Sequence, residues 1–147
     1  MQNVLEMYPP WWNDNISLFN RFEVNGLVFW HRTRLSGCFF QKVESTHLNG
    51  LEKSDRGTST CRIRENESYL DPDEWEALRD KGYYFTLRPE DIIVLGNTPD
   101  INESIAGQRS SDLLENNRYA FRITDTAVNI KGGSPHYKAL GEIRQWK

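Results

Sequence analysis

Apolar and polar residues alternate with period two along much of the chain, a pattern typical of strands with one buried face. Two long segments, 16–22 and 27–35, alternate in this way, and Val24-Asn25-Gly26 lies between them. Asn-Gly is the strongest short signal for a hairpin turn, because both residues tolerate positive φ. We interpret Ser36-Gly37 as a second turn that leads into a short strand at 38–43. The pattern therefore predicts an antiparallel hairpin followed by one more strand.

The remaining strand signals are separated by polar segments that lack any period. Two such segments, 45–59 and 96–108, are predicted to be long loops. In the strand that follows the first loop, Cys61 and Ile63 are expected to point inward. The further expected strands are 60–64, 83–87, 92–95, 119–130 and 136–146.

A single helix is predicted over 72–81. Asp71 suits the N-cap position, Pro72 the first turn, and Glu74 a variant of the capping box. Trp75 is expected to pack on the apolar face, and Gly82 to follow the last turn. A short helical turn is also expected around 113–114.

About seven strands and one short helix predict a mainly β fold, a small antiparallel barrel or sandwich with long loops. One helix cannot supply the crossovers of a parallel sheet. The 147 residues fit one domain. We expect an extended N-terminal arm at 1–15, where Pro9-Pro10 favours polyproline geometry, and a single β-rich domain at 16–147.

Charge and hydropathy narrow the classes of function. Lys and Arg total 18 and Asp and Glu 21, which gives a net charge of -3 and argues against a generally basic nucleic-acid binder. No apolar run approaches the roughly 20 residues of a transmembrane helix. The first ten residues have neither a basic region nor an apolar core typical of a secretory signal. We therefore expect a soluble protein that is intracellular when made.

Candidate catalytic or metal-binding residues are few and scattered. Cys38 and Cys61 do not have metal-ligand spacing, and each is expected to be a buried thiol in a strand. His31, His47 and His136 are far apart in the sequence. We predict no catalytic residue, no cofactor and no metal site. A pocket enclosing His31, Cys38 and a carboxylate would instead indicate an enzyme of unknown type.

Two pairs of arginines form a possible basic patch. Arg32 and Arg34 share one strand face, as do Arg62 and Arg64. If the two strands are neighbours, the four guanidinium groups form a stripe that can contact phosphates. Together with Trp30, such a stripe would suit an oligonucleotide-binding β-barrel, which is the alternative function. The other interpretation is a solvated outer face balanced by nearby glutamates.

The N-terminal arm is a candidate protein interface, formed by Tyr8, Pro9, Pro10, Trp11 and Trp12. Adjacent tryptophans in an extended segment point in different directions, and Trp and Tyr are preferred residues at protein interfaces. We predict that Trp11 or Trp12 inserts into a groove of an adjacent subunit or a neighbouring component. The alternative is that both rings pack on the chain's own domain.

The order of these motifs resembles a known group of proteins. The motifs lie at 8–14, 16–22, 32–40, 83–87 and 89–96. In this order they resemble a family of small uncharacterised proteins encoded among the head and tail genes of phages and prophages of Gram-positive bacteria. The segments 121–125 and 133–136 also resemble, more loosely, head–tail connector (stopper or head-closure) proteins.

The resemblance implies a virion structural protein, a head–tail connector or neck component that acts through protein–protein contacts in a ring. It implies no catalytic residues. The expected partners are other phage neck, head or tail proteins and further copies of the chain. No membrane partner is expected, and nucleic acid only as DNA in a channel. The implied location is the bacterial cytoplasm during assembly and then the virion.

Overall fold

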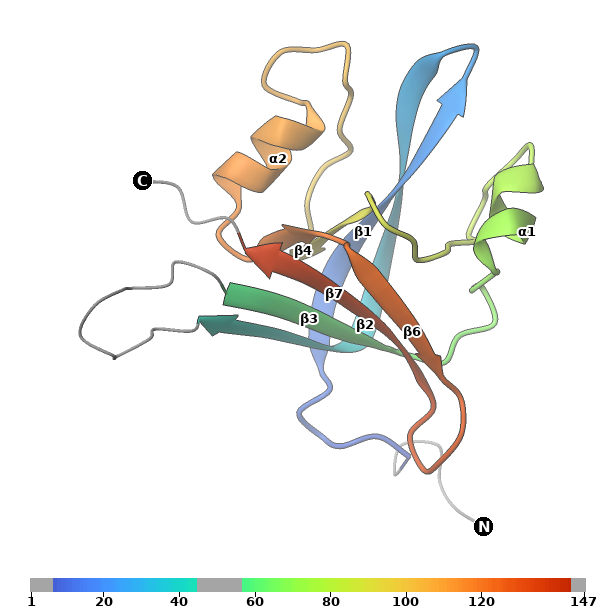
Figure 1. The fold of residues 1–147 in the computed structure, drawn as a ribbon, viewed down its shortest axis with the longest axis vertical. Helices are drawn as coiled ribbons and strands as arrows, with labels where there is room; N and C mark the ends of the chain where they lie inside the picture. Colours follow the sequence, from blue (N-terminus) through green and yellow to red (C-terminus); the bar gives the residue numbers. More distant parts are fainter. Residues whose placement is uncertain (1–6, 45–56, 144–147) are drawn as a thin grey trace.

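The computed structural model describes residues 7–44 and 57–143 (Figure 1). His47 and Trp146 lie outside the described residues, as do the first six residues of the expected arm. Most of the expected 45–59 loop and the last part of the expected strand 136–146 also lie outside them.

The described strands form one antiparallel sheet of seven strands, in the order β5-β4-β1-β2-β3-β7-β6. The prediction of a mainly β fold with about seven strands is confirmed. The strands are β1 (Asp14–Val24), β2 (Leu27–Glu44), β3 (Gly57–Arg64), β4 (Ile92–Leu95), β5 (Ala120–Arg122), β6 (Asp125–Asn129) and β7 (His136–Ile143).

The two end strands of the sheet, β5 and β6, are consecutive along the chain. β5 pairs with β4 and β6 pairs with β7, so the short connection at 123–124 joins both ends of the sheet. Thr124 N donates to Leu140 O at 2.8 Å within this connection. The sheet therefore curls into a barrel, whose strongly bent strands are visible in Figure 1.

The predicted hairpin between β1 and β2 is confirmed. Val24 pairs with Leu27, and the two turn residues have positive φ, 52° at Asn25 and 79° at Gly26. Both values fit the two-residue turn that matches the twist of a hairpin.

The predicted turn at Ser36-Gly37 is wrong, because β2 continues through it as a single strand of 18 residues. Gly37 has a φ of 68°, and the register shifts there: Asp14 faces Cys38, whereas Ile16 faces Leu35. The extra residue forms a β-bulge, which bends the strand. The bend carries β2 from its pairing with β1 to its pairing with β3.

The described residues contain two helices, α1 (Pro72–Ala77) and α2 (Ser110–Asn116). The expectation of a single helix over 72–81 is wrong, because α1 is shorter and α2 is the longer of the two. At the start of α2, the carboxylate of Asp112 accepts a hydrogen bond from Arg109 N at 3.0 Å. Across 7–44 and 57–143, neither helix has the length and hydrophobicity to cross a membrane.

Lys81 completes the C-terminus of α1, a role that we expected of Gly82. Its ammonium group donates to the carbonyl oxygens of Trp75 and Leu78, each at 2.8 Å. A cation suits the last carbonyls of a helix. At the other end, Asp71 is the N-cap residue, as predicted, but its side chain makes no cap hydrogen bond, so the expected capping interaction is wrong.

Two of the expected strands also differ from the structure. The segment 83–87 contributes one isolated bridge, between Phe85 and Tyr69, instead of a strand. The expected strand 119–130 is interrupted at 123–124, where the chain passes from β5 to β6.

The core has three parts. Side chains from the strands and from the connecting segments at 85–87 and 123 fill the barrel, and Cys61 and Ile63 point inward as predicted. A second cluster around Phe19 lies on the outer face of β1 and β4 and is covered by α2. Trp75 of α1 is fully buried, as predicted, beside the base of the hairpin. The barrel interior contains Ile16, Leu18, Leu35, Cys38, Cys61, Ile63, Phe85, Leu87, Ile93, Phe121, Ile123, Tyr137 and Ala139.

Candidate functional site

The N-terminal segment packs against its own barrel through Tyr8 and Trp12. The side chains of Tyr8 and Trp12 are buried. The Tyr8 hydroxyl donates to Pro135 O at 2.6 Å. The Trp12 ring lies 6.2 Å from the Phe39 ring and 5.3 Å from the His136 ring. Residues 8–12 are therefore part of the folded domain, and β1 begins at Asp14, inside the range that we assigned to an extended arm.

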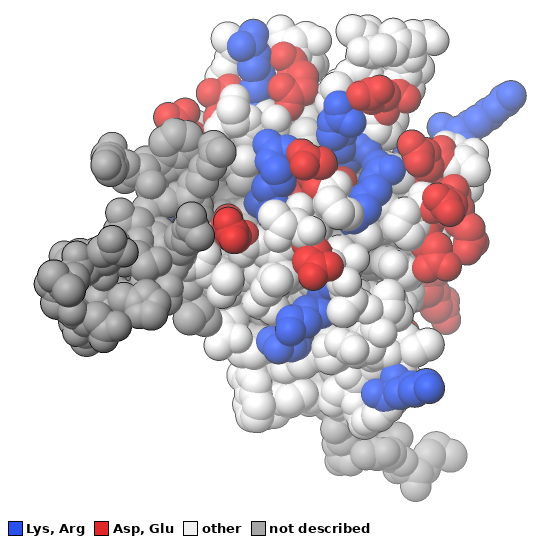
Figure 2. All heavy atoms as spheres, in the orientation of Figure 1, with Lys and Arg blue, Asp and Glu red and all other residues white. Residues whose placement is uncertain are grey.

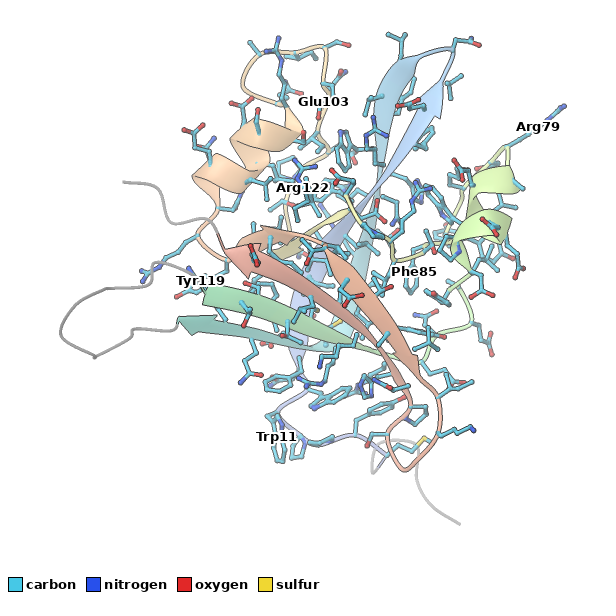
Figure 3. The ribbon with its side chains drawn as sticks, in the orientation of Figure 1. Trp11, Arg79, Phe85, Glu103, Tyr119 and Arg122 are labelled. Atoms are coloured by element: carbon cyan, nitrogen blue, oxygen red, sulfur yellow. The ribbon has the colours of Figure 1, made fainter. Side chains whose placement is uncertain are left out.

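Trp11 has the opposite environment, because 61% of its surface is exposed. Both tryptophans lie in one turn, residues 9–12, in which Trp12 N donates to Pro9 O at 3.0 Å. Pro10 is exposed beside Trp11. We call Pro10 and Trp11 the N-terminal surface; Figure 3 shows Trp11 projecting from the lower end of the molecule.

A second exposed apolar surface lies on the β1–β2 hairpin. Val24, Leu27 and Phe29 are 48%, 63% and 44% exposed, and we call them the hairpin surface. They share one face with Phe22, because Val24 pairs with Leu27 and Phe22 pairs with Phe29. The Phe22 and Phe29 rings stack with centroids 5.7 Å apart. The sequence placed Phe22, Leu27 and Phe29 in strands and Val24 in the turn, without indicating that the hairpin extends beyond the barrel.

The base of the hairpin surface is held by Trp75. The Phe22 ring meets the Trp75 ring edge-on at 6.1 Å, and the Lys81 ammonium lies 4.2 Å from the Trp75 ring centroid. The Arg88 guanidinium lies 5.0 Å from the same ring. These contacts fix the lower half of the hairpin, so its apolar face is presented in a defined orientation.

The N-terminal and hairpin surfaces lie at opposite ends of the long axis. The hairpin rises from the barrel at the top of Figure 1, and Trp11 lies at the bottom of the same view in Figure 3. A rigid barrel therefore separates two exposed apolar surfaces. This arrangement can bridge two neighbouring proteins.

The arginines of the predicted basic patch contact different parts of the chain. Arg32 donates to Thr98 O at 2.9 Å and lies 3.4 Å from the Asp100 carboxylate. Arg64 donates to the backbone oxygen of Trp12 at 2.9 Å and lies 4.8 Å from the Tyr8 ring. Their two strands are neighbours, as the patch requires, but pair only from Phe39 onward in β2.

The other two arginines differ from each other. Arg62 lies 5.8 Å from the Phe39 ring, and Arg34 is exposed. Figure 2 shows Lys and Arg interspersed with Asp and Glu over the visible face. Arg32, Arg62 and Arg64 each contact another part of the chain, so their guanidinium groups are less available to phosphates.

The structure does not bring Cys38 and His31 together. Cys38 and Cys61 are free thiols inside the barrel, and burial raises the pKa of the Cys61 thiol well above its usual value. His31 lies against Trp75, with ring centroids 6.1 Å apart, and burial lowers its pKa. The strand rise places residues 31 and 38 roughly 20 Å apart. Across the described part of the chain, no three His, Cys, Asp or Glu side chains gather in a metal-binding arrangement.

Asp91 is a buried carboxylate that sequence reasoning missed. It accepts hydrogen bonds from Asn20 Nδ2 at 2.8 Å and from Arg21 N at 2.9 Å, and Arg88 Nε lies 3.8 Å away. Burial raises the pKa of Asp91 to about 6, against the opposing effect of these donors. The hydrogen bonds from Asn20 and Arg21 tie the segment before β4 to β1, so the role of Asp91 is structural.

A groove of about 540 Å³ runs beside the hairpin. Residues 26–30 form one wall, residues 102–104 and Ser110 the other, and Arg21 and Arg122 complete it. Glu103 Oε1 accepts from Trp30 Nε1 at 2.8 Å and from Ser110 N at 3.0 Å. Burial acts to raise the pKa of Glu103, but these hydrogen bonds outweigh it and lower the pKa. Glu103 and Arg122 are labelled in Figure 3, between α2 and the hairpin.

A family model matches most of the chain. A family model described as "Family of unknown function (DUF6751)" matches residues 11–142. The chain therefore belongs to this family, and the match includes Trp11, the hairpin and all seven strands apart from Ile143, the last residue of β7. No curated protein and no solved structure matches the chain.

Proposed function

We propose that this chain is a phage or prophage virion structural protein, a head–tail connector or neck component that acts through protein–protein contacts rather than catalysis. The observation that carries the proposal is the pair of exposed apolar surfaces at opposite ends of the barrel. A component between two neighbouring rings needs one contact surface on each side. In this proposal, copies of the chain form the ring.

The composition of the two surfaces supports association with protein. Trp11 is largely exposed, and aromatic side chains are enriched among the residues that dominate interface energies. Leu27 and Phe29 add an exposed aliphatic and an exposed aromatic group to a hairpin whose base is fixed by Trp75. A tryptophan that becomes fully buried at an interface contributes on the order of 2–4 kcal/mol.

The assembly setting is supported by the resemblance of the motifs at 8–14 and 32–40 to proteins encoded among phage head and tail genes. The proposed location follows from that setting: the bacterial cytoplasm during assembly, then the virion. DNA contact in this proposal is limited to DNA passing through a channel.

Deleting the gene in its native genome tests the proposal. After induction, electron microscopy should show DNA-filled heads separated from tails, and the wild-type gene supplied in trans should restore joined particles. A Trp11→Ala gene should fail to restore them while producing folded protein. Intact infectious particles from the deletion strain would contradict the proposal.

A second measurement distinguishes the proposed protein contacts from the alternative function, oligonucleotide binding. Fluorescence anisotropy of labelled single-stranded DNA should show no saturable binding at low salt if the contacts are with protein. Saturable binding that weakens steeply with added salt, and that is lost in Arg34→Gln, would favour a nucleic-acid-binding barrel instead.

A further inference from the structure

The hairpin part of β2 has an unpaired backbone edge. β2 pairs with β3 only from Phe39 onward, so the stretch before the bulge has a neighbouring strand on one side alone within the described chain. Such an edge offers N–H and C=O groups in the spacing that another strand requires. No described residue hydrogen-bonds to the outward backbone groups of Val28 or Trp30.

The register identifies which groups face outward. Arg21 N donates to the Asp91 carboxylate, which lies on the side of β1 away from β2. Arg21 is paired with Trp30, and in an antiparallel ladder both members of such a pair turn their backbone groups outward. The same holds two residues along, for the pair of Glu23 and Val28. Val28 and Trp30 therefore present backbone donors and acceptors at the free edge.

This free edge borders the groove. Five consecutive residues, 26–30, line it, whereas a groove lying only across a face of the hairpin would be lined by alternate residues. Five strand residues span roughly 15 Å, which is enough for four or five residues of an added strand. The opposite wall, formed by 102–104 and Ser110, would enclose that strand from the other side.

The two faces of the hairpin define the chemistry of an added strand. On one face, Arg21 and Arg122 line the groove. One guanidinium nitrogen of Arg21 lies 2.7 Å from the Glu23 carboxylate, and one of Arg122 lies 3.3 Å from the Glu90 carboxylate. The carboxylate among the lining residues, that of Glu103, is already hydrogen-bonded to Trp30 and Ser110. The other face presents Leu27 and Phe29, both exposed.

We infer that the groove binds an extended peptide segment of a partner protein, which adds to β2 as a strand. Side chains of such a strand alternate between its two faces. On the face of Val28 and Trp30, side chains of the added strand enter the groove that Arg21 and Arg122 also line, so acidic residues suit this face. On the other face, apolar residues lie beside Leu27 and Phe29. The recognised segment is one in which acidic and apolar residues alternate. The inference rests on the proposed function only in taking a protein as the partner.

A labelled, blocked eight-residue peptide in which valine and glutamate alternate provides the probe. Its anisotropy with the full chain should show saturable binding, which Val28→Pro should weaken at least tenfold. Proline removes an outward N–H at the groove edge and leaves the ladder with β1 intact. The matched control is Glu23→Pro, which removes the outward N–H of the cross-strand partner on the opposite edge and should not weaken binding.

Charge is tested separately. Arg21→Gln should weaken binding of the glutamate peptide several-fold and leave binding of the matched glutamine peptide unchanged. Equal losses for both peptides would overturn the assignment of acidic residues to that face.

If Val28→Pro does not fold, two backbone-methylated peptides test the wild-type chain instead. They carry methyl groups on alternate amides, so one of them should lose binding and the other retain it. Equal binding of both, absence of binding at millimolar concentration, or equal effects of Val28→Pro and Glu23→Pro would overturn strand addition. None of these results alters the particle phenotype of the gene deletion, so the two proposals fail separately.

Discussion

Two adjacent residues have different expected roles: Trp12 in the stability of the fold and Trp11 in association with other proteins. Trp12 is 6% exposed and packs against Phe39, so Trp12→Ala should reduce the free energy of unfolding by about 3–5 kcal/mol. Trp11 is largely exposed, so Trp11→Ala should change it by less than about 0.5 kcal/mol. Urea denaturation followed by circular dichroism measures both. A large loss of stability in Trp11→Ala would place that ring in the core instead of at an interface.

The buried carboxylate of Asp91 predicts a pH dependence with a definite sign. Its pKa is about 6 in the folded chain and about 3.9 when unfolded, so the folded state binds the proton more tightly. The stability contributed by this group is full below about pH 4 and is lost as the pH rises through about 6.

Asp91→Asn tests this sign. The substitution leaves one of the donors from Asn20 or Arg21 without an acceptor and should cost about 1–3 kcal/mol. Because Asn does not titrate, the cost relative to wild type should shrink by about 1 kcal/mol between about pH 5 and about pH 7.5. Denaturant titrations at the two pH values measure it. A cost that stays the same at both pH values would mean that the surrounding N–H donors keep Asp91 ionised throughout this range.

Single residues differ in how far sequence could predict their environment. Cys61 and Ile63 point inward because alternation within their own strand determines the face. The contacts of Arg32 and Arg64 depend on Asp100 and on Tyr8, which only the folded barrel brings near them. The exposure of Phe29 was likewise not predictable, because alternation gives a face but not whether another element covers it.

At the scale of elements, the hairpin turn depends on backbone conformation rather than on space. A Cβ at Gly26 would meet nothing within 4 Å, yet its φ is 79°. Gly26→Val should therefore cost about 1–3 kcal/mol, whereas Gly26→Asn should cost less because Asn tolerates this conformation. Thermal unfolding of both variants measures the difference. Equal losses would point to a lost contact at the turn instead of backbone strain.

The predicted element boundaries were wrong where one sequence signal is compatible with two structures. Ser36-Gly37 suggested a turn, but a glycine with positive φ also serves a bulge inside a continuous strand, and the pairing of Asp14 with Cys38 determines which occurs. α2 was underestimated because its N-cap residue is Arg109, which carries no capping signal in sequence. Residues 83–87 are strand-like in composition but have one isolated bridge as their only ladder contact among the described residues.

At the scale of the whole molecule, barrel closure depends on the close approach of β7 to β5. A Cβ at Gly141 would lie 2.3 Å from the backbone oxygen of Arg122 and 2.4 Å from the Phe121 ring. Gly141→Ala should therefore destabilise the fold by about 1–3 kcal/mol or more, because backbone must move to accommodate it.

Gly133→Ala is the matched control for this prediction. A Cβ there would meet nothing within 4 Å, and the residue does not have positive φ. Its effect should stay within about 0.5 kcal/mol. Calorimetric unfolding of both variants measures the difference, and a Gly141→Ala chain as stable as the control would contradict the tight closure.

The closed barrel also has a consequence for the rate at which the chain folds. β1 and β2 are joined by two residues and can pair early, but β3 must find β7, with Arg64 beside His136 and Gly57 beside Ile143. Joining segments so distant costs loop-closure entropy before any contact compensates for it. Refolding should therefore take milliseconds to seconds, as in other folds dominated by non-local pairing. Until β3 and β7 pair, their backbone edges are open to pairing with another chain, so refolding yield should fall as protein concentration rises.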